Sequence, residues 1–299
     1  MMFAIITPAL ITGAFVERMK FKTFLVFVLL WTTLVYDPIA HWVWGVGGWL
    51  GNLGALDFAG GNVVHISSGV SALVVALVIG KRKGLGKDSM EPHDIRMMIL
   101  GAGLLWFGWF GFNAGSALTS GALATSAFTV THIAASDGAV SWMIVSWIRQ
   151  KKPSIIGVAT GAVAGLVAIT PAAGFVGPLA AIAIGVGVGV VSFFAIELKT
   201  KLGFDDSLDV WAVHGIGGTW GALATGIFAT ATIGGVDGLL YGNANQLGIQ
   251  AISVGVTWVY AFVVTLVILK VLDKTMGLRV SEEEEELGTD ISLHGERIP

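Results

Sequence analysis

The chain has 299 residues, of which 55% are hydrophobic and only 12% are charged, and its mean hydropathy is +0.80. Since a soluble domain usually has about 25% charged residues, this composition excludes an ordinary soluble protein. The net charge of −3 argues against a nucleic-acid partner, and the absence of cysteine excludes disulfides and thiolate metal sites.

Apolar segments recur along the whole chain, and most are long enough to cross a bilayer core of about 30 Å as helices. They predict an all-α, polytopic membrane protein, a helical bundle rather than one large soluble core. The nine segments are residues 2–16, 23–45, 59–80, 97–119, 122–148, 154–171, 176–198, 208–232 and 247–272. The first segment is short, which suggests that something is missing before it.

The basic residues indicate how these segments are oriented. All 17 lysines and arginines lie in the first, third, fifth and seventh connections or at and beyond the last segment. The other connections contain none. Because basic residues concentrate on the cytoplasmic side, we expect the N-terminus outside and the C-terminal tail in the cytoplasm. The expected location is the inner (plasma) membrane.

Two segments share a signature. DFAGGNVVHISSG begins at Asp57 and DSLDVWAVHGIGG begins at Asp206. Each has a Val-His eight residues after the first aspartate, at His65 and His214, and a glycine four residues beyond the histidine. The expected topology gives the two segments opposite directions. Similar elements of opposite direction indicate an inverted-topology repeat, in which the shared site lies near the membrane midplane.

The paired histidines are candidate functional residues, because an ionisable group deep in a membrane is costly. A facing pair could line a pore for a small polar molecule or a proton, bind a metal, or ligate haem. The repeat-related aspartates are interpreted as helix caps, since a carboxylate can accept from the exposed N–H groups at a helix start. Asp57 could also stabilise a cation on the outer side, whereas Asp206 would lie on the inner side.

Five strings resemble the successive signatures of the ammonium transporter family (Amt/Mep/Rh), in the family's order and spacing. They are FAIITPALITGAFVER, PIAHWVWG, DFAGGNVVHISSG, GWFGFNAGS and DDSLDVWAVHGIGG. The resemblance covers essentially the whole chain and implies a homotrimer with one pore per subunit. Prokaryotic members have eleven spans, so it also implies that the first two are absent here. The chain would be a fragment or a gene model begun at an internal methionine, and we expect it alone to insert poorly or leak.

The resemblance assigns an outer ammonium-binding site to Phe3, Trp44 and Ser116, supported by Asp57. These residue types suit a cation that is losing water. Aromatic faces attract a cation by about 0.5–2 kcal/mol each, and the hydroxyl of Ser116 can accept a hydrogen bond from it.

The resemblance further assigns a gate to two stacked phenylalanines, Phe3 and Phe112, and a second pore aromatic to Trp109. His65 and His214 would be the twin pore histidines, able to accept and relay a proton near neutral pH. The implied function is an ammonium channel that deprotonates ammonium and passes ammonia, with or without the proton. Potassium has a similar size but no proton to give, which would explain selectivity without a size filter.

The tail, residues 274–299, is polar and acidic, and composition alone favours disorder. Its resemblance to the family's cytoplasmic tail implies partial order and docking of a PII-type signal protein, apart from the channel domain at residues 1–273. Two alternatives stay open: an ammonium sensor that signals through a docked partner, and a membrane cytochrome that ligates haem through both histidines. We find no hydrolase, metalloprotease or phosphate-loop motif, and expect no enzyme activity, cofactor or metal.

Overall fold

The computed structural model describes residues 1–297, which form helices and contain no strand beyond an isolated bridge between Met19 and Arg279. All nine apolar segments expected from the sequence are helical. The corresponding helical units are α1 (Met2–Leu10) with η1 (Ile11–Ala14); α2 (Phe21–Trp31), η2 (Thr32–Tyr36) and α3 (Asp37–Trp44); η3 (Gly61–Ile66) with α5 (Ser67–Ile79); α6 (Ile95–Ala114) with η4 (Gly115–Ala117); α7 (Ala122–Gln150); α8 (Ile155–Ile169); α9 (Pro178–Leu202); η5 (Trp211–Ile216) with α10 (Gly217–Phe228); and α12 (Ala244–Thr275).

Short helices occupy the connections and the tail. They are α4 (Trp49–Leu53), α11 (Ala231–Gly234), η6 (Leu239–Tyr241), α13 (Glu282–Leu287) and η7 (Asp290–His294).

Several of the long units can cross a membrane. By length and composition, five qualify: residues 21–53, 61–79, 95–117, 178–202 and 244–275. Residues 2–14 and 155–169 form shorter apolar helices. The chain is therefore a multi-pass membrane protein, whereas the count of nine spans stays a prediction from the hydropathy pattern.

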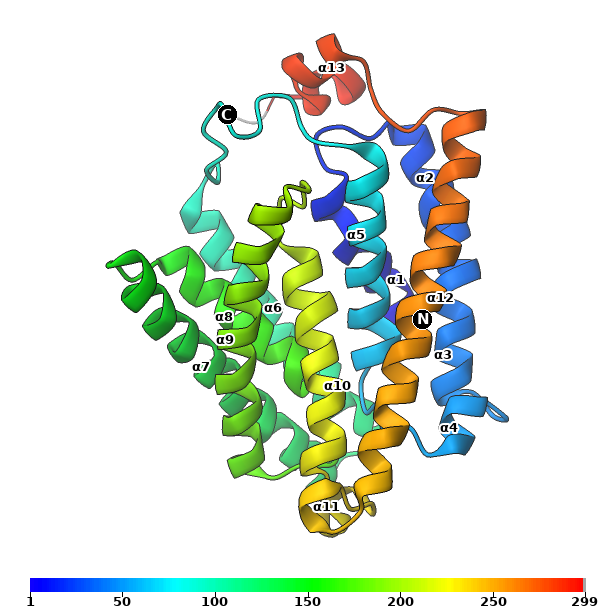
Figure 1. Ribbon diagram of the computed structural model, residues 1–299, viewed down its shortest axis with the longest axis vertical. Helices are drawn as coiled ribbons and strands as arrows, with labels where there is room; N and C mark the ends of the chain where they lie inside the picture. Colours follow the sequence, from blue (N-terminus) through cyan, green and yellow to red (C-terminus); the bar gives the residue numbers. More distant parts are fainter. Residues whose placement is uncertain (298–299) are drawn as a thin grey trace.

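Two antiparallel helices, α5 and α10, form the centre of the bundle (Figure 1). Helices α7, α8 and α9 pack together on one side, and α2, α3 and α12 lie on the other. The tail helix α13 lies at one end of the bundle, and α4 and α11 lie at the opposite end. The two sequence repeats therefore meet in the middle, where each supplies one central helix.

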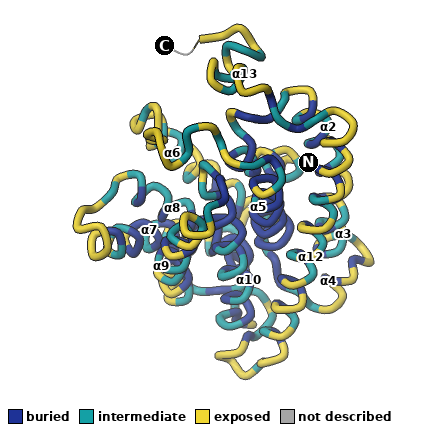
Figure 2. The backbone as a smooth tube through the Cα atoms, turned by 45° about the horizontal axis from the view of Figure 1, so that its top comes forward, coloured by how far each residue is buried: buried dark blue, intermediate teal, exposed yellow. Residues whose placement is uncertain are grey.

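Burial differs sharply between helices (Figure 2). Of the most apolar stretch within residues 61–79, 83% is buried inside the chain, against 6% for the corresponding stretch within residues 95–117. The near-continuous apolar sequence of α5 thus reflects a central helix, which is apolar all round because it is buried all round. Helix α6 is apolar but exposed along most of its length.

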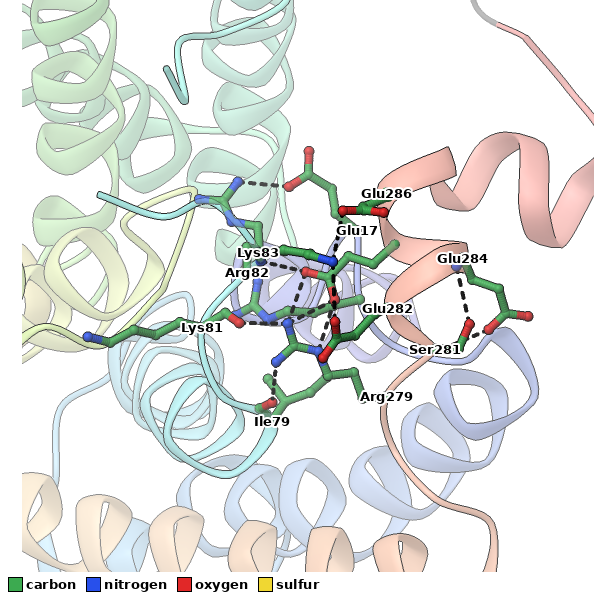
Figure 3. A network of polar contacts seen from close by, with 12 residues as sticks. Glu17, Ile79, Lys81, Arg82, Lys83, Arg279, Ser281, Glu282, Glu284 and Glu286 are labelled. Atoms are coloured by element: carbon green, nitrogen blue, oxygen red, sulfur yellow. Dashed lines mark hydrogen bonds and ion pairs between the residues drawn. The ribbon is translucent and has the colours of Figure 1, made fainter. Parts of the chain in front are cut away.

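The acidic tail is folded back against the bundle (Figure 3). Ser281 begins α13 with a capping box closed by Glu284. Arg279 donates from Nη2 to Glu285 (2.8 Å) and to the carbonyl of Lys81 (2.6 Å). Lys83 pairs with acidic side chains of α13, and these contacts raise its pKa. The described part of the tail is therefore folded against the loop that follows α5, in agreement with the partial order that the resemblance implies.

An ionic cluster centred on the buried residues Arg18 and Asp205 joins three connections at the same end of the bundle. Arg82 donates two bonds to the carboxylate of Asp205, at 2.9 and 3.0 Å, and a third to Glu17 at 2.8 Å. Arg18, with no exposed surface, donates to the carbonyl of Asp205 at 2.6 Å. Burial alone would raise the pKa of Asp205, but the hydrogen bonds from Arg82 and the nearby positive charges lower it overall. The cluster fixes the loop that leads into η5.

Candidate functional site

Both histidines lie in π-helical turns. His65 is in η3, which continues into α5, and His214 is in η5, which continues into α10. A π-turn is a local widening of the helix that occurs frequently at functional sites. The equal local structure at both positions matches the repeat seen in the sequence.

The structure brings the two histidines into direct contact. Their Nδ1 atoms lie 3.1 Å apart, which is hydrogen-bonding distance. His65 is fully buried and His214 is 8% exposed. Nε2 of His65 is buried and has no hydrogen-bond partner among the described residues. Each repeat thus contributes one imidazole to a single buried pair.

Paired glycines allow this close approach. Gly69 follows His65 by four residues and lies against the backbone of Gly215, where a Cβ on Gly69 would overlap the Gly215 nitrogen and Cα. Gly218 follows His214 by four residues, and a Cβ there would lie 3.0 Å from the Cβ of His65. The sequence showed the spacing of these glycines, but their packing role depends on the crossing of the two helices.

An aromatic column leads from one end of the bundle to the histidines. Ring centroids are 5.9 Å apart for Trp44 and Phe3, 4.4 Å for Phe3 and Phe112, and 5.8 Å for Phe112 and His65. Trp109 stacks on His65 at 5.4 Å with an angle of 16° between the ring planes. Four separate elements therefore assemble the column: α1, α3, α6 and η3.

The gate pair differs from the expected arrangement in one detail. Phe3 and Phe112 are inclined by 41° instead of being stacked in parallel, a tilted arrangement that suits the quadrupoles of two aromatic rings. Ser116, one turn beyond Phe112, donates its hydroxyl hydrogen to the Phe112 carbonyl at 2.8 Å. The lone pairs of Ser116 therefore stay available to accept a hydrogen bond.

The repeat-related aspartates both lie at helix starts, but they are used differently. The carboxylate of Asp57 accepts from the N–H groups of residues 60–63 at 2.5–3.3 Å. Its backbone carbonyl accepts from Nε1 of Trp44 at 2.8 Å. Asp206 accepts from the N–H of Trp211 at 2.8 Å, and its Oδ1 is buried with no hydrogen-bond partner in the part of the chain that the structure describes. Asp57 thus caps η3 and also orients Trp44.

Thr170, which is not among the site residues predicted from the sequence, lies behind the column. Thr170 accepts a hydrogen bond from Nε1 of Trp109 at 2.9 Å. A signal for it existed, because Ile-Thr-Pro-Ala occurs at residues 6–9 and again at residues 169–172. This second repeated string would have identified α1 and α8 as equivalent helices and Thr170 as a residue to examine.

The contact between the histidines does not fit haem or another metal held between them. Two nitrogen atoms on opposite sides of one metal lie about 4 Å apart, since each bond is about 2 Å. The Nδ1 atoms are 3.1 Å apart and bond each other. The geometry is that of two imidazoles hydrogen-bonded to each other.

Comparisons of the sequence and of the structure with known proteins point to the same family. The Ammonium Transporter Family profile matches residues 1–298. An ammonium transporter of Bacillus subtilis is 55% identical over 99% of this chain and 74% of its own length. The crystal structure of Mep2 from Candida albicans has a TM-score of 0.90 and 41% identity, over 95% of this chain and 65% of that chain.

A structure described as a Sensor Amt Protein is also similar, with a TM-score of 0.90 and 33% identity over 98% of this chain and 75% of that one. The chain thus spans about two thirds of the length of the Candida protein and three quarters of that of the other two.

Proposed function

Because this chain belongs to the ammonium transporter family, we propose that it forms most of the conducting unit of an ammonium transporter. The observation that carries the proposal is the buried contact between His65 and His214 at the end of an aromatic column. Neither feature is needed to pack a helical bundle. Together they offer a cation site that leads to a proton acceptor inside a membrane.

The first step is recruitment of ammonium at the open end of the column. Trp44 is 38% exposed, and its ring lies 5.9 Å from that of Phe3, so two aromatic faces can compensate for lost water. Ser116 can accept one of the ammonium hydrogens. Asp57 holds Trp44 in place through its carbonyl. Phe3 and Phe112 close the route below this site until their rings move apart.

Deprotonation follows, because a bare charge is costly deeper in the membrane. In the neutral histidine pair, one Nδ1–H donates to the other Nδ1, so the two rings are opposite tautomers. One Nε2 is then an acceptor and the other carries hydrogen. The acceptor Nε2 can take the ammonium proton, leaving ammonia, and the pair can pass that proton on or return it. Potassium has no proton to transfer and cannot follow this route.

The remaining assignments follow the basic residues and the tail. We place the protein in the inner (plasma) membrane of the cell. Trp44 then lies at the outer face and α13 lies in the cytoplasm. The channel domain is residues 1–273 and the tail is residues 274–299, in a homotrimer with one pore per chain. The docked acidic tail supports a cytoplasmic partner of the PII type.

A second candidate function is ammonium sensing. It is favoured by the likeness to the Sensor Amt Protein and by the docked tail. The tail contacts the loop that directly follows α5, the helix that η3 and its His65 lead into. In a sensor, the same aromatic column would bind ammonium, and a partner on the tail would read the bound state without net flux.

The decisive experiment measures ammonium flux and current in proteoliposomes that contain the full-length native protein. His65→Ala and His214→Ala should each abolish flux or lose the preference for ammonium over potassium. His132→Ala is the matched control, since His132 is an exposed residue of α7 whose ring packs on Trp106 and Phe110. If both pore variants behave like the wild type, the histidines only pack the core and the proposed mechanism is wrong. Ammonium binding without flux in the wild type would favour the sensor.

A further inference from the structure

Buried hydrogen bonds cross three helices behind the pore aromatics. Nε1 of Trp109 on α6 donates to the hydroxyl of Thr170 at the end of α8, at 2.9 Å. The same hydroxyl lies 3.2 Å from Oδ1 of Asn113, and Asn113 donates through Nδ2 to Thr131 on α7 at 3.0 Å. None of these four residues is more than 4% exposed. A polar network this deep in an apolar bundle is costly unless it is satisfied, and a satisfied network makes a unique arrangement rigid.

Thr170 also adjoins the element that carries His65. The carbonyl of the next residue, Pro171, accepts from the backbone N–H of Phe58 at 3.1 Å. The Pro171 ring packs on Gly61, the first residue of η3, where an added Cβ would lie 2.5 Å from the Pro171 Cβ. The end of α8 therefore touches both partners of the histidine–tryptophan stack: the indole through the Thr170 side chain, and η3 through Pro171.

We propose that Thr170 is a positioning residue that sets the plane of Trp109 against His65, and so tunes how the pore treats ammonium relative to potassium. The proposal rests on the proposed transport function. A threonine hydroxyl has one hydrogen and two acceptor sites. It accepts from the indole with one site, and its single hydrogen goes to the Leu166 carbonyl at 2.7 Å or to Asn113. Its removal leaves the indole N–H buried and unpaired.

The role is specific to this threonine. Thr7, in the matching Ile-Thr-Pro-Ala string of α1, donates to the carbonyl of Phe3 in its own helix, and no bond from a tryptophan to it is seen in the described chain. Thr160, on the same helix as Thr170, likewise donates to the carbonyl four residues earlier, Ile156, at 2.9 Å, and within residues 1–297 its hydroxyl has no other partner. Thr160 is therefore a matched control for the loss of a helical hydroxyl.

The test compares Thr170→Val, Thr170→Ser and Thr160→Val in the full-length native protein reconstituted in proteoliposomes. Valine keeps the shape and removes the acceptor, whereas serine keeps the acceptor. We expect Thr170→Val to lower the ammonium-to-potassium flux ratio by roughly tenfold, which corresponds to about 1.4 kcal/mol. Thr170→Ser and Thr160→Val should keep the wild-type ratio. A wild-type ratio in Thr170→Val would overturn the proposal, as would an equal loss in Thr160→Val.

A double mutant separates positioning from general packing. Trp109→Phe keeps an aromatic ring and removes the N–H, so Thr170→Val added to it should lower the ratio no further. Additive losses would mean that Thr170 acts by another route.

A readout without transport distinguishes this proposal from the proposed function. In protein labelled with ¹⁵N-tryptophan, the indole resonance that disappears in Trp109→Phe should shift in Thr170→Val and stay in place in Thr170→Ser. If the wild type carries no ammonium, the proposed function fails. The indole shift then still decides whether Thr170 holds Trp109, and an unchanged resonance in Thr170→Val refutes that contact.

Discussion

Gly69→Ala tests whether the close crossing of the two central helices, α5 and α10, holds the two histidines together. The new Cβ would overlap the nitrogen and Cα of Gly215, which are backbone atoms and cannot rotate away. Real Cβ atoms essentially never come within 3.0 Å of another heavy atom. The helices must therefore separate by on the order of 1 Å, a backbone shift of the kind that overpacking forces. The histidine contact of 3.1 Å cannot survive that shift, because hydrogen bonds end near about 3.5 Å.

The energetic effect has two opposing parts. Alanine is a better helix former than glycine by about 1 kcal/mol, while overpacking a tight contact costs about 1–3 kcal/mol. Gly255→Ala on α12 is the matched control, because a Cβ there meets nothing within 4 Å and only the first part applies. Thermal unfolding in detergent should therefore show Gly69→Ala several degrees less stable than Gly255→Ala. Reconstituted flux should show that Gly69→Ala has lost ammonium selectivity.

The reasoning would be refuted by a Gly69→Ala protein that is as stable and as selective as Gly255→Ala. That result would mean that the helices can separate without disturbing the histidines, so the contact between them would not depend on the glycine crossing.

Two further predictions concern charged groups. Asp57→Asn keeps the shape but loses a carboxylate that caps four N–H groups, so it should destabilise the protein by roughly 1–3 kcal/mol in thermal unfolding. Asp237→Asn, which loses one exposed bond, should change little, and equal effects would argue against the cap. Asp205 has a lowered pKa, so its contribution to stability is present above the ordinary carboxyl value of 3.8 and is lost as the pH falls below it. In Asp205→Asn, the melting temperature should therefore fall less between about pH 5 and pH 2 than it does in the wild type. An unchanged dependence of the melting temperature on pH would mean that other groups cause the fall.

Much of the fold could be predicted from the sequence because membrane-spanning segments are long runs of apolar residues. A bilayer requires long apolar helices, and all nine expected segments are helical. The repeated Asp–His–Gly spacing also indicated two equivalent elements, and both prove to be π-turns that continue into central helices. Both aspartates lie at helix starts as expected. These features are local, and local spacing is what a sequence contains.

The arrangement of the site required the tertiary structure. The tilt between Phe3 and Phe112 and the stack of Trp109 on His65 depend on how helices far apart in sequence cross. The repeated Ile-Thr-Pro-Ala string marks Thr170 in the sequence, but its bond to Trp109, 61 residues away, is seen only in the folded structure.

By itself, then, the sequence determined that the protein crosses a membrane and has two equivalent elements with a histidine in each. Only the tertiary structure decided that the histidines touch, that glycines let them do so, and that buried hydrogen bonds hold the aromatic rings beside them. The physical reason is that hydropathy and helix periodicity act within a segment. Contacts of 3 Å depend instead on side-chain shapes from several segments fitting together at once.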